Sequence, residues 1–567
     1  MDKNRSLVRL LLSCFGAIVL LYVDADASRD SLWTVPFDCP VRFLITTPEN
    51  TLLAFTDSGA CAIETETGRP LWRRTDFEGD IWTYCGLVPA SPYAVVCYGD
   101  IVSGTSGRRG DHAAVLSDPS ALSVIRNHLF VIDYFTGATM WDARSVGVTS
   151  SMGHFHMPTA GALMLYGRNE AAEDAMMAVT YMNGEVLWKN GLFFPPGEDP
   201  PLISQPNGVK TLLGNQPPLF DTDSTMITFM DKHAIRKWNT ITGELIWRTP
   251  LEAGAVPPIC SWFAPMVLDS ARGVFYAPCD ETLLSINLSD GGITWTTKPR
   301  LKGRIHQIFL TPAGILVKGG GDQSGYGGMP FLTLLNPETG AQVWAAPFRQ
   351  LYSQTNVVLQ SDKIIAYGNN RLYEVSLLDG SFRELAQNID FHGGESPQAL
   401  DLTDEGYVLM ASQNLVLIDT SGHTIYRTYF KMPGRDEIGI DDFLLSVLWG
   451  GLVMGPLITG IMATANQAPS GYPRYQELST GLPRLGTTTF ARNNIYMLAD
   501  VEDFVIDFQR SKRHHDKGPG LVKLPKVWGD ASNDVILKDL KPVYTVNAAE
   551  DRLFVALNGK RLVCFKF

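Results

Sequence analysis

Two histidines that flank a single residue, His154 and His156, are the first candidates for chemistry in this sequence. In a β-strand, residues two apart point to the same face, so both imidazoles would share one side, where a pair of nitrogens can bind zinc. No motif supplies a third ligand, and the simpler interpretation is two histidines on a packed or solvated strand face. The run 512–516, Lys-Arg-His-His-Asp, is expected to be an exposed charged loop. We therefore predict no metal site.

The motifs of common hydrolases and nucleotide-binding proteins are absent. The sequence contains neither a Gly-x-Ser-x-Gly nucleophile motif nor a His-Glu-x-x-His zinc motif. The glycine-rich run 319–328 lacks the Lys and Ser/Thr of a phosphate-binding loop, and no helix pattern follows it. It is interpreted as a long connection between strands, and no catalytic residue can be assigned.

The N-terminus predicts a secretory signal peptide over residues 1–27. Basic residues precede an uncharged apolar run over 10–23, and Ala-Asp-Ala at 25–27 matches a small-x-small cleavage pattern. An uncleaved membrane anchor is the alternative, but the run is short for a bilayer span. We expect the mature chain, 28–567, to reside in the secretory pathway, in the ER lumen, at the cell surface or outside the cell.

Cysteine pairing is chemically permitted in that pathway. Apart from Cys14, the chain has an odd number of cysteines. Neighbours along the chain suggest disulfides between Cys85 and Cys97 and between Cys260 and Cys279. Reduced, buried thiols are the alternative for each of them.

Two short motifs point to surface functions. Asn287-Leu288-Ser289 matches the N-glycosylation sequon, so Asn287 is the predicted glycosylation site, just before a turn at Gly291. Arg-Gly-Asp at 109–111 lies in a polar insertion, 99–122, and is expected to be a chance match to the integrin-binding tripeptide. The insertion 99–122 and the glycine-rich run 319–328 are both predicted to be connecting loops.

The elements that must position these residues are copies of one repeat. In its clearest copy, 238–247, an extended run reaches a Thr-Gly turn at Gly243, and Trp247 follows four residues later. Two weaker copies turn at Gly380 and Gly422, the second with Tyr426 in the tryptophan place. The tryptophans at this position are Trp72, Trp141, Trp188, Trp247, Trp295 and Trp344.

Each copy predicts a β-hairpin, because a glycine able to adopt positive φ joins two β-rich runs. The turns recur about every 40 to 70 residues, a period typical of propellers and solenoids. The intervals contain further short β-rich runs and no long amphipathic helix pattern. The sequence therefore predicts an all-β, closed β-propeller with eight or more blades.

The two chain ends complement one another. Residues 32–37 match the outgoing strand of later repeats but lack an incoming partner, whereas 551–565 is a hairpin with no outgoing strand. We therefore predict that the N-terminal strand completes the C-terminal blade and closes the ring. The uncharged run 443–463 is long enough to span a membrane, but its glycines, Pro456 and ring closure favour two buried strands.

The repeat resembles that of the pyrroloquinoline-quinone (PQQ) propeller superfamily, in which the turn and the tryptophan dock neighbouring blades. The resemblance implies a blade-docking role for Trp72, Trp141, Trp188, Trp247, Trp295 and Trp344. The superfamily includes quinone- and calcium-dependent alcohol dehydrogenases as well as non-enzymatic scaffolds. Many of those dehydrogenases have adjacent cysteines beside the cofactor, and this sequence has no two consecutive cysteines.

The composition narrows the class of partner. A net charge of −12 without a basic stripe argues against binding to nucleic acid. The structural repeat is clear, whereas the sequence contains no recognisable catalytic motif. This contrast favours a non-catalytic scaffold that binds a protein partner through its loops and uses no cofactor. The alternative is a quinoprotein oxidoreductase that holds PQQ and calcium at the centre of the ring. Membrane attachment is the less favoured arrangement.

Overall fold

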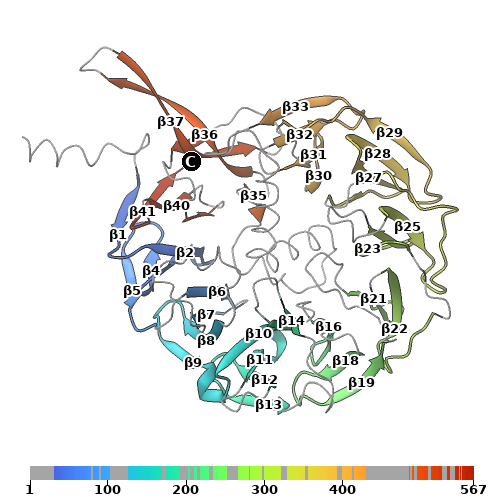
Figure 1. The fold of residues 1–567 in the computed structure, drawn as a ribbon, viewed down its shortest axis with the longest axis horizontal. Coiled ribbons are helices and arrows are strands. Elements are labelled where there is room, and N and C mark those ends of the chain that lie inside the picture. The colour runs from blue at the N-terminus through green and yellow to red at the C-terminus, as the bar shows by residue number, and fades with distance from the viewer. Residues whose placement is uncertain are drawn as a thin grey trace, which may run out of the picture.

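The computed structural model of this chain consists of β-sheets arranged in a circle (Figure 1). Apart from two 3-10 helices, η1 (Ala143–Val146) and η2 (Pro158–Ala160), the regular structure that it describes is β, which confirms the predicted class. The described residues are 31–77, 81–88, 91–101, 125–168, 174–190, 202–204, 210–212, 218–228, 234–251, 266–279, 281–295, 299, 301–320, 329–351, 355–392, 397, 399–411, 414–429, 484–485, 488–490, 494–507, 512–525, 533–536, 543–547, 550, 552–557 and 559–566.

The repeating unit is an antiparallel four-stranded sheet formed by consecutive strands. Its fourth strand lies at the circumference, as β5, β9, β13 and β19 do in Figure 1. The first such sheets are β2 (Val41–Thr46), β3 (Thr51–Thr56), β4 (Gly59–Glu64) and β5 (Pro70–Arg74); β6 (Ile81–Leu87), β7 (Tyr93–Ile101), β8 (Ile125–Asp133) and β9 (Thr139–Asp142); β10 (Ser150–Met157), β11 (Ala162–Arg168), β12 (Asp174–Thr180) and β13 (Val186–Asn190); and β16 (Leu219–Thr222), β17 (Thr225–Thr228), β18 (Ala234–Asn239) and β19 (Leu245–Pro250).

Two of the following sheets have three strands, and isolated bridges such as Leu332 to Phe348 stand where a fourth strand would lie. These are β20 (Val267–Asp269), β21 (Val274–Cys279) and β22 (Thr282–Asn287), then β23 (Ile305–Thr311), β24 (Gly314–Gly319) and β25 (Phe331–Leu335). The remainder are β14 (Leu202–Ser204) with β15 (Lys210–Leu212); β26 (Val358–Leu359), β27 (Lys363–Gly368), β28 (Arg371–Ser376) and β29 (Phe382–Ala386); and β30 (Ala399–Thr403), β31 (Gly406–Met410), β32 (Asn414–Ile418) and β33 (Thr424–Tyr429).

The chain ends meet in one sheet. Its order is β1 (Trp33–Pro36), β41 (Arg561–Lys566), β40 (Arg552–Leu557) and β39 (Val543–Asn547). The register pairs Trp33 with Cys564 and Pro36 with Arg561. The N-terminal strand therefore supplies the outer strand of the C-terminal sheet, as the unmatched halves of the repeat predicted.

A five-stranded sheet precedes this closing sheet and corrects one prediction. It contains β34 (Arg484–Leu485), β35 (Thr488–Phe490), β36 (Asn494–Asp507), β37 (Lys512–Pro525) and β38 (Asn533–Ile536), and the β36–β37 hairpin reaches beyond the circle in Figure 1. The charged run 512–516 is thus strand, and predicting a loop there was wrong. Its polarity misled the prediction, because the register pairs this run residue by residue with β36, from Lys512 opposite Asp507 to Asp516 opposite Asp503.

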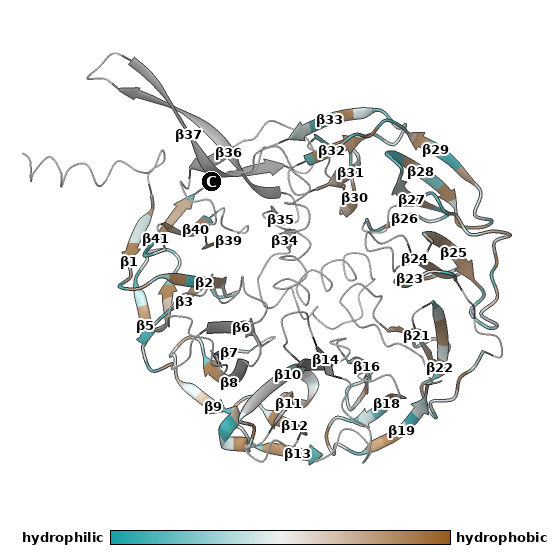
Figure 2. Ribbon diagram, in the orientation of Figure 1, coloured by the Kyte–Doolittle hydropathy of each residue, from teal (hydrophilic) through white to brown (hydrophobic). Residues whose placement is uncertain are grey.

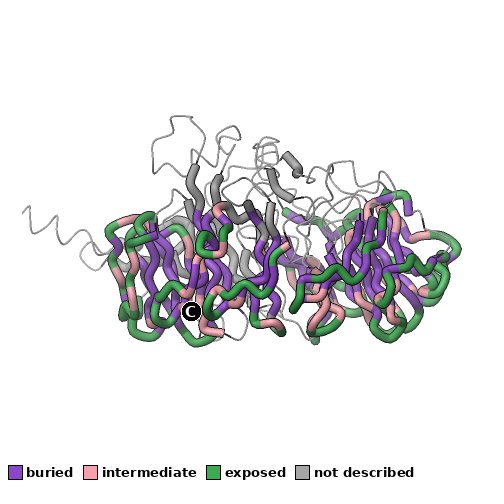
Figure 3. The backbone as a smooth tube through the Cα atoms, turned by 90° about the horizontal axis from the view of Figure 1, so that it is seen from below, coloured by how far each residue is buried: buried purple, intermediate pink, exposed green. Residues whose placement is uncertain are grey.

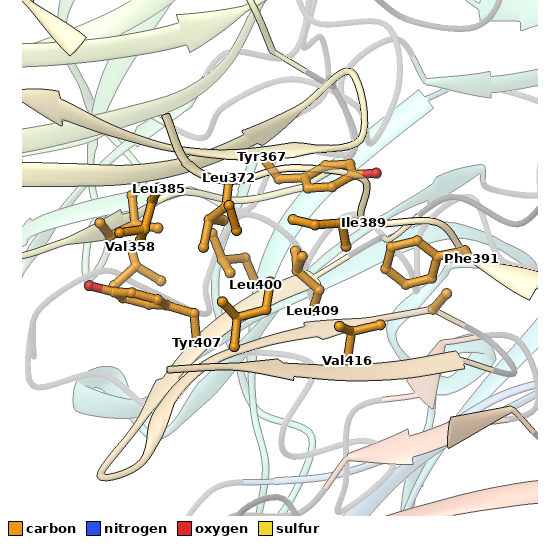
Figure 4. Packing of buried hydrophobic residues seen from close by; sticks show 14 residues of the cluster. Val358, Tyr367, Leu372, Leu385, Ile389, Phe391, Leu400, Tyr407, Leu409 and Val416 are labelled. Carbon is orange, nitrogen blue, oxygen red and sulfur yellow. The ribbon is translucent and has the colours of Figure 1, made fainter. Parts of the chain in front are cut away.

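The hydrophobic core lies between neighbouring sheets. Strand interiors are buried and turns are exposed (Figure 3), and apolar residues follow the strands (Figure 2). In one cluster, Leu372 of β28 and Tyr407 of β31 pack together across two sheets (Figure 4). Another joins Trp33 and Phe554 of the closing sheet to Leu52 of β3. Each sheet is therefore stabilised by burial against its neighbours, since apolar surface leaves water on both of its faces.

A β-bulge precedes the tryptophan in four outer strands. In β19, Leu245 and Ile246 together oppose Trp238, so the next residue, Trp247, is turned back toward the body. The same register shift occurs before the tryptophans of β5, β9 and β13. Because two residues stand opposite one, the strand twists locally. This shift aims the indole of each unit toward the adjoining unit.

Candidate functional site

Seven turn glycines lie against the tryptophan of the preceding unit. Gly243 has φ +72°, and a Cβ placed on it would lie 2.5 Å from Cδ2 of Trp188. A side chain there would be strained by the positive φ and would also overlap the indole. The same arrangement, with φ between +71° and +74°, occurs for Gly68 with Trp33, Gly137 with Trp72, Gly184 with Trp141, Gly291 with Trp247, Gly340 with Trp295 and Gly380 with Trp344.

Each of these tryptophans also makes a hydrogen bond to the turn that it covers. The indole N–H donates to the backbone carbonyl three residues before the glycine, which satisfies both buried groups. The donors and acceptors are Trp33 to Thr65 (2.8 Å), Trp72 to Tyr134 (2.8 Å), Trp141 to Tyr181 (3.1 Å), Trp188 to Thr240 (2.8 Å), Trp247 to Leu288 (3.1 Å), Trp295 to Pro337 (2.9 Å) and Trp344 to Leu377 (3.1 Å).

Trp33 makes the same contact, although it was not among the six tryptophans predicted for this role. It stacks over Gly68, and its ring centroid lies 5.8 Å from that of Phe554 in the C-terminal sheet. The signal was present, because Trp33 occupies in 32–37 the place that Trp247 occupies in 246–251. The repeat pattern does not include Trp33, because no turn glycine precedes it in the sequence.

A second position of the repeat contacts the same turns. Two residues after the tryptophan, a side chain donates to the carbonyl of the next turn glycine in three units. Arg74 Nη1 donates to Gly137 O at 2.8 Å, Asn190 Nδ2 to Gly243 O at 2.9 Å and Thr249 Oγ1 to Gly291 O at 2.6 Å. Sequence comparison missed this position because three unlike residue types share it.

A buried ion pair adds to one of these joints. Lys237 Nζ lies 2.5 Å from Asp221 Oδ2 and also donates to Leu288 O at 2.9 Å. That carbonyl belongs to the next unit and already accepts the indole N–H of Trp247. The salt bridge lies within one sheet, and the second hydrogen bond of Lys237 reaches across the joint to the next sheet, so the buried charge has partners on both sides.

The series of tryptophans ends at the turn of Gly380. The following turn, at Gly422, has φ +97°, and a Cβ there would lie 1.9 Å from Leu385 O, so backbone replaces the indole. A different link joins these two units: Asn356 donates to Leu400 O at 2.7 Å and accepts from Leu400 N at 2.8 Å. Close approach is thus maintained where the tryptophan is missing.

The two histidines of β10 share one face, as their spacing predicted. His154 and His156 face Leu165 and Leu163 of β11, and their ring centroids are 6.0 Å apart. His156 Nδ1 lies 3.1 Å from the hydroxyl of Tyr181. Burial lowers the pKa of His154 to about 3 and that of His156 to about 4. Among the described residues, no group of three His, Cys, Asp or Glu side chains could hold a metal ion.

The proposed Cys85–Cys97 disulfide is wrong. Cys85 faces Val96 in the register of β6 and β7, so Cys97 projects from the opposite side of the sheet. The two side chains accordingly join different hydrophobic clusters, and both are free thiols. Burial raises the pKa of each thiol well above its usual range. Cys279 is buried at the end of β21, and its proposed partner Cys260 lies outside the described residues, so this second disulfide stays a prediction.

Asn287 is the last residue of β22 and forms the turn that receives Trp247. Its Oδ1 accepts hydrogen bonds from Ser289 N at 2.8 Å and from Ser289 Oγ at 2.7 Å. The residue is half-buried, whereas Ser289 is exposed. Asn239 and Asn336 cap the equivalent turns in the same way. The sequon thus coincides with a structural position of the repeat.

Several sequence features fall outside the described residues. They are the predicted signal peptide over 1–27, the Arg-Gly-Asp tripeptide at 109–111, most of the glycine-rich run 319–328 and the apolar run 443–463. Within the described part of the chain, no helix has the length and apolar character that a membrane crossing requires.

Comparison with known proteins supports the repeat assignment. The PQQ-repeat family described as outer membrane protein assembly factor BamB matches residues 176–423. Compared with curated protein sequences, the chain has no match. Solved structures with a similar arrangement include BamB from Moraxella catarrhalis and Sqt1 from Saccharomyces cerevisiae. Each is 12% identical, covers 70% of this chain and 99% of its own, and has a TM-score of 0.34.

Proposed function

Because residues 176–423 carry the PQQ-type repeat of the BamB family, we propose that the chain is a closed β-propeller of eight or more blades that binds other proteins without catalysis. Support for closure comes from the series of tryptophan-to-turn contacts, which starts at Trp33 and runs to Gly380. The pairing of β1 with β41 supports it further, because it joins the first and the last strand of the chain in one sheet.

We assign the six predicted tryptophans and Trp33 a blade-docking role. Each combines a buried indole, a turn glycine without space for a side chain, and a hydrogen bond to that turn. None of these features involves a reactive group. They hold successive sheets in fixed positions, so that loops at the rim and faces of the ring are presented on a rigid frame.

The binding role rests on two observations. The matching family is described as an assembly factor, which is a protein-binding task, and function carried over from a shared repeat remains an analogy. Among the described residues, no group of three potential metal ligands gathers, and the buried thiols of Cys85 and Cys97 lie in hydrophobic clusters rather than in an acid–base or nucleophilic pair. A scaffold needs no such pair.

The test has two arms, the first with the purified mature chain and the second in cells that express it. In the first, the protein is incubated with PQQ and calcium, and we expect neither a retained chromophore nor dye reduction with alcohols or sugars. Either signal would overturn the non-catalytic role. In the second, in-cell crosslinking is followed by mass spectrometry, with the Trp188→Ala variant as a control for frame integrity. Recovery of one reproducible partner, lost when the frame is loosened, is expected, and no partner would contradict the scaffold role.

Entry into the secretory pathway and glycosylation of Asn287 complete the proposal. The motivating features are the signal-like segment 1–27 and the sequon at the turn of β22. A glycosidase should increase the electrophoretic mobility of the expressed protein, and Asn287→Gln should abolish that change. An unprocessed N-terminus together with no shift would contradict the secretory assignment.

A further inference from the structure

Two neighbouring outer strands, β13 and β19, present large apolar side chains to solvent. Val186 and Leu187 of β13 are 40% and 37% exposed, and Leu245 and Ile246 of β19 are each 46% exposed. These pairs occupy the β-bulges before Trp188 and Trp247, where two consecutive residues oppose one. The bulge explains why both face outward. It does not explain why both are apolar, since a solvent-facing bulge has no packing requirement.

The two strands are linked across the joint between their units. Trp188 of β13 donates to Thr240 O in the turn that leads into β19, and Asn190 donates to Gly243 O of the same turn. Ile241, beside Thr240, is 58% exposed and extends the apolar surface across the joint. The two strands also lie next to each other on the circumference in Figure 1. An exposed apolar area that spans two units is typical of a contact site.

Charged residues follow the same order on both strands. Glu185 and Lys189 lie two residues before and two residues after Leu187. Glu244 and Arg248 lie two residues before and two residues after Ile246, and all four charged residues are exposed. The order Glu, apolar, apolar, Trp, basic is therefore repeated on adjacent strands. The exposed faces of β13 and β19 from 185–189 and 244–248 are called the rim surface below.

This order is self-complementary under a two-fold rotation. An axis that crosses both strands at the level of Leu187 and Ile246 sets each strand antiparallel to its own copy. Leu187 then faces Leu187 of the second copy, and Glu185 faces its Lys189. The same axis sets Ile246 against Ile246 and Glu244 against Arg248. A two-fold interface requires one patch that matches itself, and here one axis satisfies both strands.

We propose that the rim surface binds a second copy of this chain and forms a two-fold dimer, an association that does not depend on the binding function proposed above. The contact is made through side chains. Pairing of the backbones by strand addition is disfavoured, because the bulges at Leu187 and Ile246 interrupt the ladder that an added strand would extend. Apolar contacts at the axis supply affinity, and the flanking charges fix the antiparallel orientation.

Analytical ultracentrifugation of the full mature chain over a range of concentrations tests this proposal. We expect a dimer that dissociates on dilution. Leu187→Asp combined with Ile246→Asp should weaken dimerisation by at least about tenfold, because it brings carboxylates together at the axis. Leu378→Asp is the matched control: Leu378 is 78% exposed on another unit, so its substitution should leave the dimer intact. A monomer at every concentration would overturn the proposal.

Charge exchange tests the two-fold register. Glu244→Arg alone sets two arginines against each other and should weaken the dimer, whereas Glu244→Arg with Arg248→Glu restores opposite charges and should recover it. Failure of the double exchange to recover the dimer would refute this register. Ile246→Cys should form an intermolecular disulfide on oxidation and Leu378→Cys should not. Circular dichroism of each variant separates loss of the contact from loss of the fold.

Discussion

A glycine-to-alanine pair isolates the energy of one tryptophan-to-turn contact. Gly243 and Gly161 both have positive φ, +72° and +59°, so alanine at either position costs about 1–2 kcal/mol of backbone strain. At Gly161 an added Cβ meets nothing within 4 Å, whereas at Gly243 it lies 2.5 Å from Trp188 Cδ2. Displacing the packed indole adds about 1–3 kcal/mol. We expect Gly243→Ala to lower the free energy of unfolding by that much more than Gly161→Ala.

Guanidinium denaturation followed by circular dichroism measures both variants, and a double-mutant cycle with Trp188→Ala assigns the difference to the contact. Trp188→Ala alone should cost about 3–5 kcal/mol, because a buried indole and its bond to Thr240 are lost. With the indole gone, Gly243→Ala should cost only the backbone strain, as at Gly161. The double variant should therefore be about 1–3 kcal/mol more stable than the sum of the singles predicts. Strict additivity would refute the docking role of this contact.

Three further predictions concern the chain ends, a buried lysine and the thiols. Trp33→Ala should cost about 3–5 kcal/mol and speed amide exchange in β41, which β1 covers; protection equal to the parent would contradict ring closure. Burial lowers the pKa of Lys318 from 10.5 to about 7, so as the pH rises the folded state loses this proton before the unfolded state does. The free energy of unfolding should therefore rise by up to about 1.4 kcal/mol per pH unit between pH 7 and 10.5. Lys318→Met should flatten that rise in unfolding curves measured over a series of pH values. Under denaturing, non-reducing conditions, Cys85→Ser should titrate one thiol fewer than the parent, whereas a disulfide to Cys97 would release one more.

Much of the fold could be predicted because its information is local. A single hairpin requires a turn glycine with positive φ and an aromatic residue four positions later. The roles of Gly243 and Trp247 can therefore be recognised from their own hairpin, without knowledge of the neighbouring units. The unmatched strand at 32–37 and the unmatched hairpin at 551–565 predicted the β1–β41 pairing by the same local logic.

Other properties depended on register and on neighbours distant in sequence. Cys85 and Cys97 are close along the chain, yet pairing of Cys85 with Val96 puts the thiols on opposite sides of a sheet. The polar run 512–516 was expected to be a loop, and its strand pairing with β36 became evident only from the register. His154 and His156 share a face as their spacing requires, but sequence gave no indication that burial would keep both imidazoles neutral.

By itself, the sequence determined an all-β repeat, the turns that divide it and the aromatic residue assigned to each turn, because φ preferences and strand periodicity act over a few residues. Only the tertiary structure decided which turn each tryptophan covers, that Trp33 joins the series, and that Leu187 and Ile246 stand in solvent on adjacent strands. The physical reason is that burial and docking are properties of pairs of sheets. The residues that meet across such a pair, such as Trp33 with Thr65 or Trp72 with Tyr134, lie 32 and 62 positions apart in the chain.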